Sequence, residues 1–207
     1  MTDEYALIEK LRTRPGMYLG TNSITALWHF INGFRFALLE NGREKRGLFP
    51  LDFSFIHEYA YMLYGGARAA GWRNNILESV GGDEEKALKR FFEVFDGFKE
   101  IRADGCWRAV LSEENIAYNN GMEHGYALRG DKKEPVFSDP INVYIIGLTV
   151  GAYLLAVETA DGLRTEGFFY PSFEHAAGDK RFPEGAEVYF GKIDNWEKPD
   201  GLPECLI

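Results

Sequence analysis

The feature that most limits how this chain can fold is a change in the spacing of its apolar residues near residue 103. Before it, apolar residues recur every three or four positions, which is the spacing of one helix face. After it, short apolar runs alternate with turn residues, which is typical of β-strands. The sequence therefore predicts an α+β fold, with a helical region over 1–103 and a mainly antiparallel β region over 104–207. At 207 residues, the two regions could be separate or form one compact domain.

The clearest helix signal follows Gly81-Gly82, where Asp83 is a candidate cap and Glu84-Glu85 suit the positive end of the helix dipole. Its predicted buried face contains Ala87, Leu88, Phe91, Phe92, Phe95 and Phe98. Further helices are predicted over 3–13 with Thr2 as a cap, from Thr21-Asn22-Ser23 to Asn41-Gly42, over 52–64 and near 72–79.

Strands are predicted in the second half at Trp107–Leu111, Val143–Leu148, Tyr153–Glu158, Leu163–Tyr170 and Glu187–Ile193. The sequence Asn119-Asn120-Gly121 also predicts a hairpin turn, between strands at Asn115–Tyr118 and Met122–Leu128. Polar loops are expected over 129–139 and 171–184. Because the turns, such as Asp161-Gly162, are too short for crossover helices, the sheet should be antiparallel.

The chain has no stretch that the sequence marks as a membrane anchor. Residues 140–157 lack charge and contain a GxxxG spacing at Gly147–Gly151, but they are rich in β-branched residues and include Asn142, so two buried strands are expected. The start, Met1-Thr2-Asp3-Glu4, has no basic and apolar signal-peptide pattern. Cys106 and Cys205 lie far apart and suit free thiols, so we expect a cytoplasmic protein.

Negative charge is concentrated in the second half. The net charge is −9, and residues 106–207 hold nine Lys/Arg against 17 Asp/Glu. Nucleic-acid binding and attachment to an anionic membrane both need clustered cations, so neither is expected. An acidic half can steer a basic partner, although it also keeps a protein soluble.

Residues that could carry out catalysis are scattered. The histidines show no metal-ligand spacing, and no nucleotide or nucleophile fingerprint is present, so we assign no catalytic residue, metal or cofactor. An enzyme remains the alternative, with Glu123-His124 as a general base or Cys106 as a thiol beside another titratable group. A solvated hairpin arm and a small buried thiol are the structural interpretations of the same residues.

The string from Arg14 through Pro15, Gly16, Met17, Tyr18 and Leu19 to Gly20 is the most distinctive in the chain. Its proline and glycines predict a short extended segment between two helices. It resembles the RPGMYIG segment of the ATPase domain of type II topoisomerases. The other segments of that family, a metal-binding helix, DxGxG and a glycine-rich lid, are not present in order.

Together with Phe30-Ile31-Asn32-Gly33, Gly71-Trp72 and the Phe-rich helix, the same string resembles another group over residues 5–100. It is similar to uncharacterised bacterial immunity-type proteins encoded in polymorphic-toxin and contact-inhibition neighbourhoods. The resemblance implies a binding or accessory protein and transfers no catalytic residues. In this interpretation the Arg14–Gly20 string is scaffold.

These observations favour a non-enzymatic cytosolic protein that neutralises a basic toxin domain by occlusion. An enzyme of unknown acid–base chemistry and a ligand-sensing or structural module are the alternatives, and the oligomeric state is open. Aromatic anchors beside carboxylates suit a basic partner. The predicted partner-binding residues are Glu113, Glu114, Tyr118, Glu123, Tyr126, Phe137, Tyr170 and Phe173.

Overall fold

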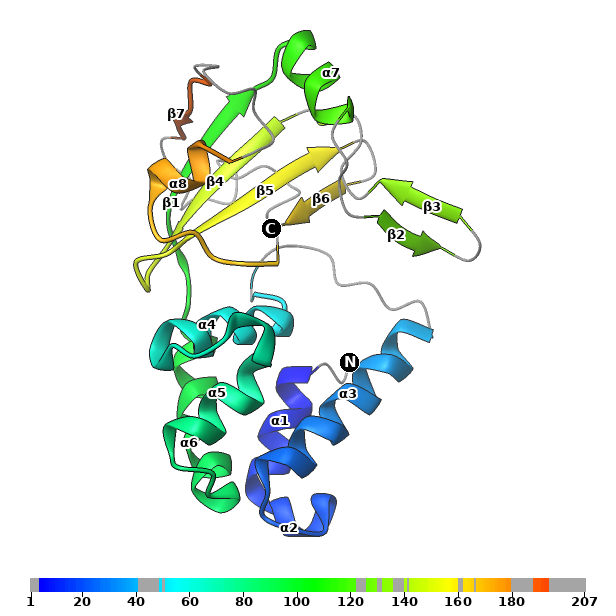
Figure 1. Cartoon of the computed structure of the whole chain (residues 1–207), viewed down its shortest axis with the longest axis vertical. Coiled ribbons are helices and arrows are strands. Elements are labelled where there is room, and N and C mark those ends of the chain that lie inside the picture. The colour runs from blue at the N-terminus through cyan, green and yellow to red at the C-terminus, as the bar shows by residue number, and fades with distance from the viewer. Residues whose placement is uncertain are drawn as a thin grey trace. The chain divides into compact units, whose positions relative to one another are not determined.

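A computed structural model shows an α+β protein, with helices mainly in the N-terminal half and strands in the C-terminal half, as predicted (Figure 1). The chain forms two compact units. The first contains residues 1–45 and 51–100, and the second contains 46–50 and 101–207. The structure describes residues 4–40, 49, 51–121, 126–129, 132–135, 140, 142–159, 162–165, 167–179 and 188–193.

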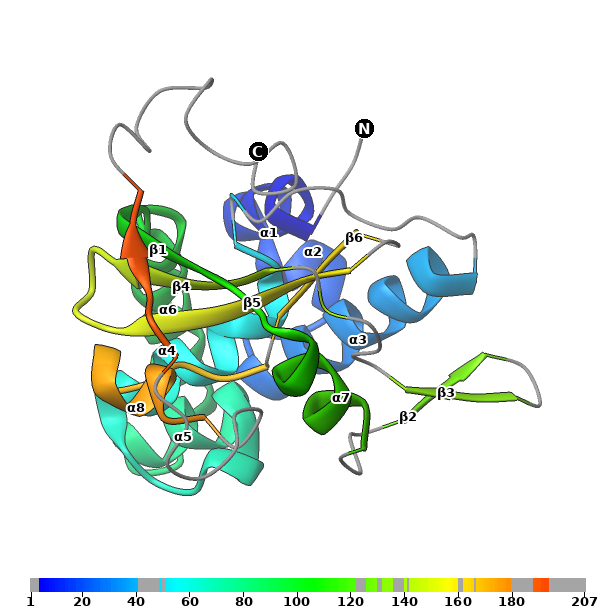
Figure 2. The same ribbon diagram turned by 90° about the horizontal axis from the view of Figure 1, so that it is seen from above.

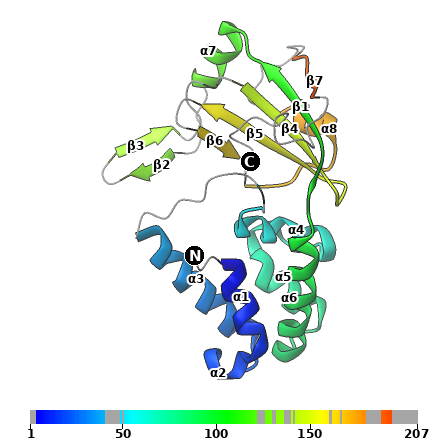
Figure 3. The same ribbon diagram turned by 180° about the vertical axis from the view of Figure 1, so that it is seen from behind.

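The first unit is helical. Its elements are α1 (Glu4–Thr13), α2 (Pro15–Leu19), α3 (Ile24–Glu40), the 3-10 turn η1 (Phe53–Phe55), α4 (Ile56–Tyr64), the 3-10 turn η2 (Arg68–Ala70), α5 (Gly71–Ser79) and α6 (Glu84–Lys99). Helix α3 runs alongside α1 and also contacts α5 and α6 (Figure 3). The predicted helices over 3–13, 52–64 and 72–79 are therefore confirmed.

Helix α6 supplies the centre of this unit through one aromatic face. Asp83 caps it by accepting a hydrogen bond from the Lys86 amide at 3.0 Å, as predicted. Phe91 and Phe95 are fully buried and stack at 6.1 Å between ring centroids. The buried Trp72 ring of α5 lies 4.7 Å from Phe91. Burying rings of this size stabilises the unit by about 2–3 kcal/mol each.

Charged groups of α6 fix the positions of its neighbours. The Glu84 carboxylate accepts hydrogen bonds from the hydroxyls of Ser23 and Thr25, both at 2.7 Å, and from the Thr25 amide at 3.0 Å. A carboxylate at the start of α3 also satisfies the positive end of that helix. On α1, Arg12 makes a two-point ion pair with Asp96, at 2.8 and 3.1 Å.

The first turn of α5 is hydrogen-bonded to a histidine of α4. The Trp72 amide donates to Nδ1 of His57 at 3.0 Å, so this nitrogen must carry no proton. Gly71, just before it, has φ of 75°, and a Cβ there would lie 3.1 Å from His57 Nδ1. A glycine is therefore needed for the ring to reach the helix start.

The Arg14–Gly20 string differs from its predicted extended form. Helix α1 ends at Thr13, but Pro15 then occupies the first turn of a short helix rather than an extended segment. Proline suits this position because its missing amide hydrogen would have no partner there. Gly20 closes the turn in the left-handed region, with φ of 74°, and its amide donates to the Gly16 carbonyl at 3.0 Å.

The second unit is built on an antiparallel sheet. Its strands are β1 (Ala103–Val110), β4 (Asn142–Leu148), β5 (Tyr153–Thr159), β6 (Gly162–Thr165) and β7 (Gly191–Lys192), in the order β6-β5-β4-β1-β7. A separate hairpin pairs β2 (Tyr126–Arg129) with β3 (Lys132–Pro135). The helices are α7 (Glu113–Gly121) and α8 (Phe173–Ala177). The antiparallel pairing of the predicted strands is confirmed.

Both helices of this unit lie on one face of the sheet (Figure 2). The core on that face is formed by four buried strand residues, Val143 and Ile145 of β4 and Leu155 and Val157 of β5. Ile116 of α7 packs against this core, as do Phe173 and Ala176 of α8. Because side chains alternate along a strand, these apolar residues share one face of the sheet, and α7 and α8 turn their apolar sides toward it.

The predicted hairpin at Asn119-Asn120-Gly121 is wrong, because these residues end helix α7. Ser112 starts the helix by accepting a hydrogen bond from the Asn115 amide at 3.2 Å, and Glu113 and Glu114 fill its first turn. Ile116 and Asn119 are three apart and both lie inward, which is helical spacing. The Asn-Gly pair thus marks a helix end rather than a strand turn.

The predicted loops also contain regular structure. Part of 129–139 forms the second strand of the β2–β3 hairpin, and part of 171–184 forms α8. Of the strands predicted over 163–170 and 187–193, the described residues pair as strands at 162–165 and 191–192, with Tyr170 in an isolated bridge to Tyr153. The predicted Thr2 cap, the Asn41-Gly42 helix end and Cys205 lie outside the described residues.

The cap at His57 makes the helical unit sensitive to acid. Burial, together with the positive charge of Arg35, lowers the pKa of His57 below its ordinary value. The unfolded chain therefore binds the proton more readily, so the stabilisation is complete above about pH 6.5 and declines as the pH falls below it. His57→Asn keeps an acceptor at this position without a titrating group. We expect thermal unfolding of that variant to change less between pH 7 and 5 than unfolding of the wild type.

His29→Gln is the matched control, since His29 is an exposed histidine of the same unit. The role assigned to His57 is wrong if both variants keep the wild-type pH dependence.

The carboxylate of Glu84 should stabilise the unit more than its exposed neighbour Glu85 does. Burial raises the pKa of Glu84, but the hydrogen bonds from Ser23 and Thr25 outweigh it and leave the pKa lowered. Its stabilisation is thus present at neutral pH and is lost as the pH falls through this lowered pKa. We expect Glu84→Gln to lower the free energy of unfolding by about 1–2 kcal/mol in urea titrations. Glu85→Gln, which breaks only the surface pair with Lys89, should cost less than about 0.5 kcal/mol, and equal losses would contradict the account.

Candidate protein-interaction surface

The outward side of α7 carries two carboxylates and an aromatic ring. Glu113 and Glu114 are exposed, and Tyr118 is 40% exposed. Glu114 and Tyr118 are four residues apart and so lie one turn apart on the same side of the helix. Since Ile116 fixes the opposite side in the core, these groups are held facing solvent.

The charges of Glu113 and Glu114 are not neutralised by neighbours, because neither has an ion-pair partner among the residues that the structure describes. The exposed carboxylates of α6 differ. Glu85 pairs with Lys89 at 3.0 Å, and Glu93 pairs with Arg90 at 2.9 Å. The first turn of α7 therefore presents net negative charge.

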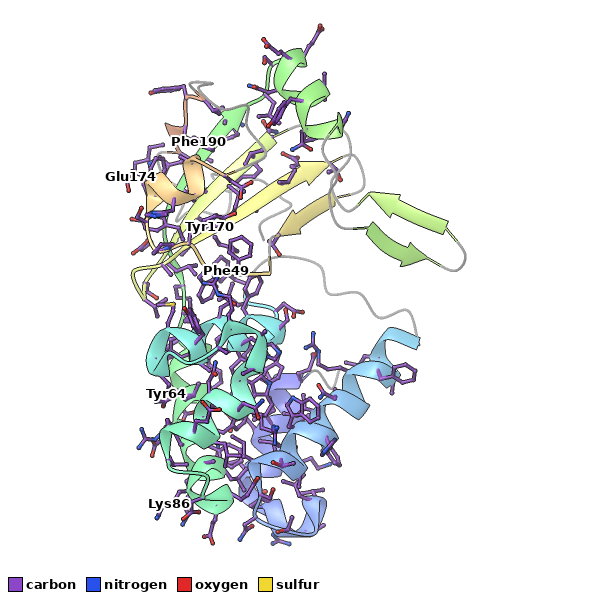
Figure 4. The ribbon with its side chains drawn as sticks, viewed as in Figure 1. Phe49, Tyr64, Lys86, Tyr170, Glu174 and Phe190 are labelled. Carbon is purple, nitrogen blue, oxygen red and sulfur yellow. The ribbon has the colours of Figure 1, made fainter. Side chains whose placement is uncertain are left out.

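Helix α8 adds a third carboxylate on the same face of the sheet. Ser172 caps this helix by accepting from the His175 amide, and Glu174 is exposed in its first turn. Figure 4 shows Glu174 at the outer margin of α8. Hydrogen bonds from its own backbone amide and from Ser172 hold the pKa of Glu174 below its usual value, so it is charged at neutral pH.

Tyr189 gives this side a second exposed ring. Val188 and Phe190 pack against the core of the unit, and Phe190 lies 6.0 Å from Phe173 between ring centroids. Because successive side chains of an extended segment point to opposite sides, Tyr189 between them turns outward and is 86% exposed. We call Glu113, Glu114, Tyr118, Glu174 and Tyr189 the α7–α8 surface.

A positive charge lies at the edge of this arrangement. Lys192 of β7 is exposed and pairs across the strands with Trp107, whose side chain packs in the core beneath α8. Directly paired residues share a face of the sheet, so Lys192 is on the same side as the two helices. Among the residues that the structure describes, the α7–α8 surface is thus acidic, with Lys192 at its β7 margin.

Tyr170 was predicted as an exposed anchor but is part of the core. It is only 6% exposed, and its hydroxyl donates to Oδ2 of Asp179 at 2.5 Å. Burial and the Asp179 carboxylate both raise the pKa of Tyr170, so it stays protonated. Its ring packs beneath α8 and is not available to a partner.

Phe173 has a similar structural role. Its ring meets Trp107 edge-on at 5.1 Å and packs against the core as the first residue of α8. It therefore holds α8 on the sheet rather than facing solvent. The sequence placed Tyr170 at the end of a predicted strand and Phe173 in the loop after it, where burial cannot be inferred from periodicity.

The remaining predicted residues are less informative. Glu123 and Phe137 lie outside the described residues, and Tyr126 is described only as the first residue of strand β2. Of the eight predicted partner-binding residues, the structure thus brings Glu113, Glu114 and Tyr118 together on one helix.

The Arg14–Gly20 string lies in the helical unit. Lys10 Nζ stands 5.9 Å from the centre of the Tyr18 ring, which ties α2 to α1. Arg14, Gly16 and Met17 are exposed, with Met17 at 68%. The string forms the connection between α1 and α3, and no ion pair of Arg14 is seen within the described part of the chain.

Two nucleophilic side chains of the described residues, Ser172 and Cys106, have structural roles. Ser172 Oγ and His175 Nδ1 lie 2.9 Å apart, but His175 is exposed and the serine is already the α8 cap. Asp179, the nearby acid, is bound to Tyr170. The side chain of Cys106 is fully buried, in agreement with the structural interpretation of that residue.

Sequence reasoning missed Glu174 and Tyr189. Glu174 follows Ser172 and Phe173 in a Ser-Phe-Glu-His string that could have been recognised as a cap followed by an acidic first turn. Tyr189 stands between Val188 and Phe190, and the period-2 alternation of the predicted strand allowed it to face either way.

No helix in the described part of the chain is long and apolar enough to cross a membrane. The same residues hold no group of three or more His, Cys, Asp or Glu side chains placed to bind a metal ion. Comparisons with known protein families, with curated proteins and with solved structures gave no match to this chain.

Proposed function

We propose that this chain is a non-enzymatic binding protein whose α7–α8 surface docks a basic partner protein. The resemblance of residues 5–100 to immunity-type proteins suggests a toxin domain as that partner, neutralised by occlusion of its active face. The observation that carries the proposal is the exposed pair Glu113 and Glu114, which lacks a described counter-ion and stands one turn from the exposed Tyr118.

The carboxylates supply long-range attraction. Residues 106–207 hold 17 Asp/Glu against nine Lys/Arg, so the second unit carries most of the net charge of −9. A concentrated negative field raises the association rate with a cationic surface and makes that rate sensitive to salt. Charge of this kind selects the class of partner, and contact residues then determine the affinity.

The aromatic rings supply that contact. Tyr118 and Tyr189 are exposed although their neighbours in the chain face inward: Asn119 is buried, and Val188 and Phe190 pack against the core of the unit. First-turn carboxylates can be explained by the stability they give to α7, but exposed tyrosines give the fold no comparable benefit. Tyrosine is enriched among the residues that dominate binding energy at protein interfaces.

The docking side is rigid enough to act without rearrangement. Ile116 and Phe173 are packed against the sheet, and Ser112 and Ser172 cap the two helices. A preformed surface loses little conformational entropy on binding. This suits a protein that must bind a toxin domain as soon as both are made.

The test is association with the product of the adjacent reading frame, measured by surface plasmon resonance with the full-length chain. Glu113→Gln/Glu114→Gln should lower the association rate about tenfold at low salt and flatten its salt dependence. Tyr118→Ala should mainly raise the dissociation rate, with an affinity loss of about 1–2 kcal/mol.

Glu85→Gln/Glu93→Gln is the matched control, because it removes two exposed carboxylates of α6 and should leave binding unchanged. Circular dichroism checks that each variant is folded. The proposal fails if the wild-type pair does not associate at micromolar concentration, or if the α7 and α6 variants bind alike.

A further inference from the structure

The described helices contain the same dipeptide, Asn-Gly, at two different places. Asn32-Gly33 lies in α3, and Asn120-Gly121 forms the end of α7. The side chains of both asparagines are exposed. The two sites thus share their chemistry and their access to water, and they differ in their position along a helix.

An asparagine followed by glycine is chemically labile, since its side-chain amide can be lost without an enzyme. The backbone nitrogen of the glycine attacks Cγ of the asparagine, so that an N–Cγ bond forms and the Cγ–Nδ2 bond breaks. The proton of the backbone amide leaves with the amino group as ammonia. Water then opens the cyclic imide at one of its two carbonyls and gives aspartate or isoaspartate. Glycine has no Cβ to crowd the attacking nitrogen.

A helix opposes this ring closure. Closing the ring turns ψ of the asparagine away from its helical value of about −42°. The amide of the following glycine is also bonded to the carbonyl four residues earlier. The reaction therefore requires the helix to open at that amide, and the free energy of such an opening differs from place to place in a protein.

Asn32 is in the most protected part of α3. It is the middle residue of a helix of 17 residues. Its neighbour Ile31 is 1% exposed, and Leu27, one turn before Ile31, is fully buried. Opening the helix at Gly33 would break backbone hydrogen bonds on both sides and draw Ile31 out of the core. We therefore expect the native fold to suppress the reaction at Asn32.

Asn120 is in the opposite situation. Asn119, at 2% exposure, anchors α7 up to that residue, and two residues of the helix follow it. The Gly121 amide belongs to the last residue of α7, so it is released when the helix shortens by its final residue. Helix ends fray in this way without unfolding of the domain.

We propose that Asn120 is a site of spontaneous deamidation in the folded protein, and that Asn32 is protected from the same reaction. The product is a carboxylate seven residues after Glu113, which is two helical turns and hence the same side of α7. The reaction makes the net charge of −9 one unit more negative. It therefore extends the acidic side of α7 toward the end of the helix.

The consequence for binding rests on the proposed function, whereas the deamidation itself is measured on the chain alone. Asn120→Asp reproduces the new charge and should raise the association rate with the product of the adjacent reading frame about twofold at low salt. Asn32→Asp, which adds the same charge to α3, is the matched control and should leave that rate unchanged. Equal rates for the two variants, in a pair that associates, would place the new charge outside the docking surface.

Peptide mass spectrometry of the full chain tests the deamidation, after incubation for several weeks at mildly alkaline pH. Trypsin cuts after Arg35 and Arg108, so the two asparagines fall on different peptides. In the native protein Asn120 should gain one dalton at least about tenfold faster than Asn32. In guanidinium chloride, where no helix remains, the two rates should be similar. Isoaspartate at position 120 identifies the cyclic imide, because direct hydrolysis gives aspartate alone.

Gly121→Ala tests the attacking nitrogen. Alanine adds a Cβ beside the nitrogen and favours the helix, so deamidation of Asn120 should slow about tenfold or more. The rate at Asn32 in the same chain is the internal control and should not change. The proposal is overturned if native Asn120 stays intact while it reacts in guanidinium chloride, or if native Asn32 reacts as fast. Loss of the amide without isoaspartate, or an unchanged rate in Gly121→Ala, would overturn the imide route.

Discussion

The helical unit depends on the aromatic face of α6. Phe91 and Phe95 are buried against Trp72, so the orientation of α6 sets that of α5. The same helix holds the start of α3 through Glu84 and holds α1 through Asp96. Each polar contact therefore gains its precision from a hydrophobic core that has already fixed the helix.

In the second unit, too, buried apolar contacts fix the positions of the helices, here on a sheet. Val143 and Ile145 form a buried stripe on which α7 and α8 rest through Ile116 and Phe173. Once these inward contacts are made, the periodicity of a helix leaves Glu113, Glu114 and Tyr118 facing outward. The first turns of α7 and α8 therefore present carboxylates to solvent. Such a surface suits the attraction of a cationic partner.

Periodicity predicted the parts of the fold whose burial is regular. Helix α6 could be predicted because its apolar residues recur on one face and Asp83 caps it. Strands β4 and β5 could be predicted because each is a continuous apolar run. Helix α7 could not be predicted in this way, because an Asn-Gly pair occurs in hairpin turns and also at helix ends. The capping residue Ser112 is the local signal that favours the helix. Tyr170 was misassigned because its burial comes from α8 packing over it, a tertiary contact that no local pattern encodes.

Hydrogen–deuterium exchange of the full chain, free and bound to the product of the adjacent reading frame, is the sharpest test of docking through the α7–α8 surface. Exchange reports which backbone amides become protected when the complex forms. If the α7–α8 surface docks the partner, exchange should slow over 113–121 and 173–177 and stay unchanged over 84–99. Protection confined to the helical unit, with α7 and α8 exchanging as in the free protein, would contradict it.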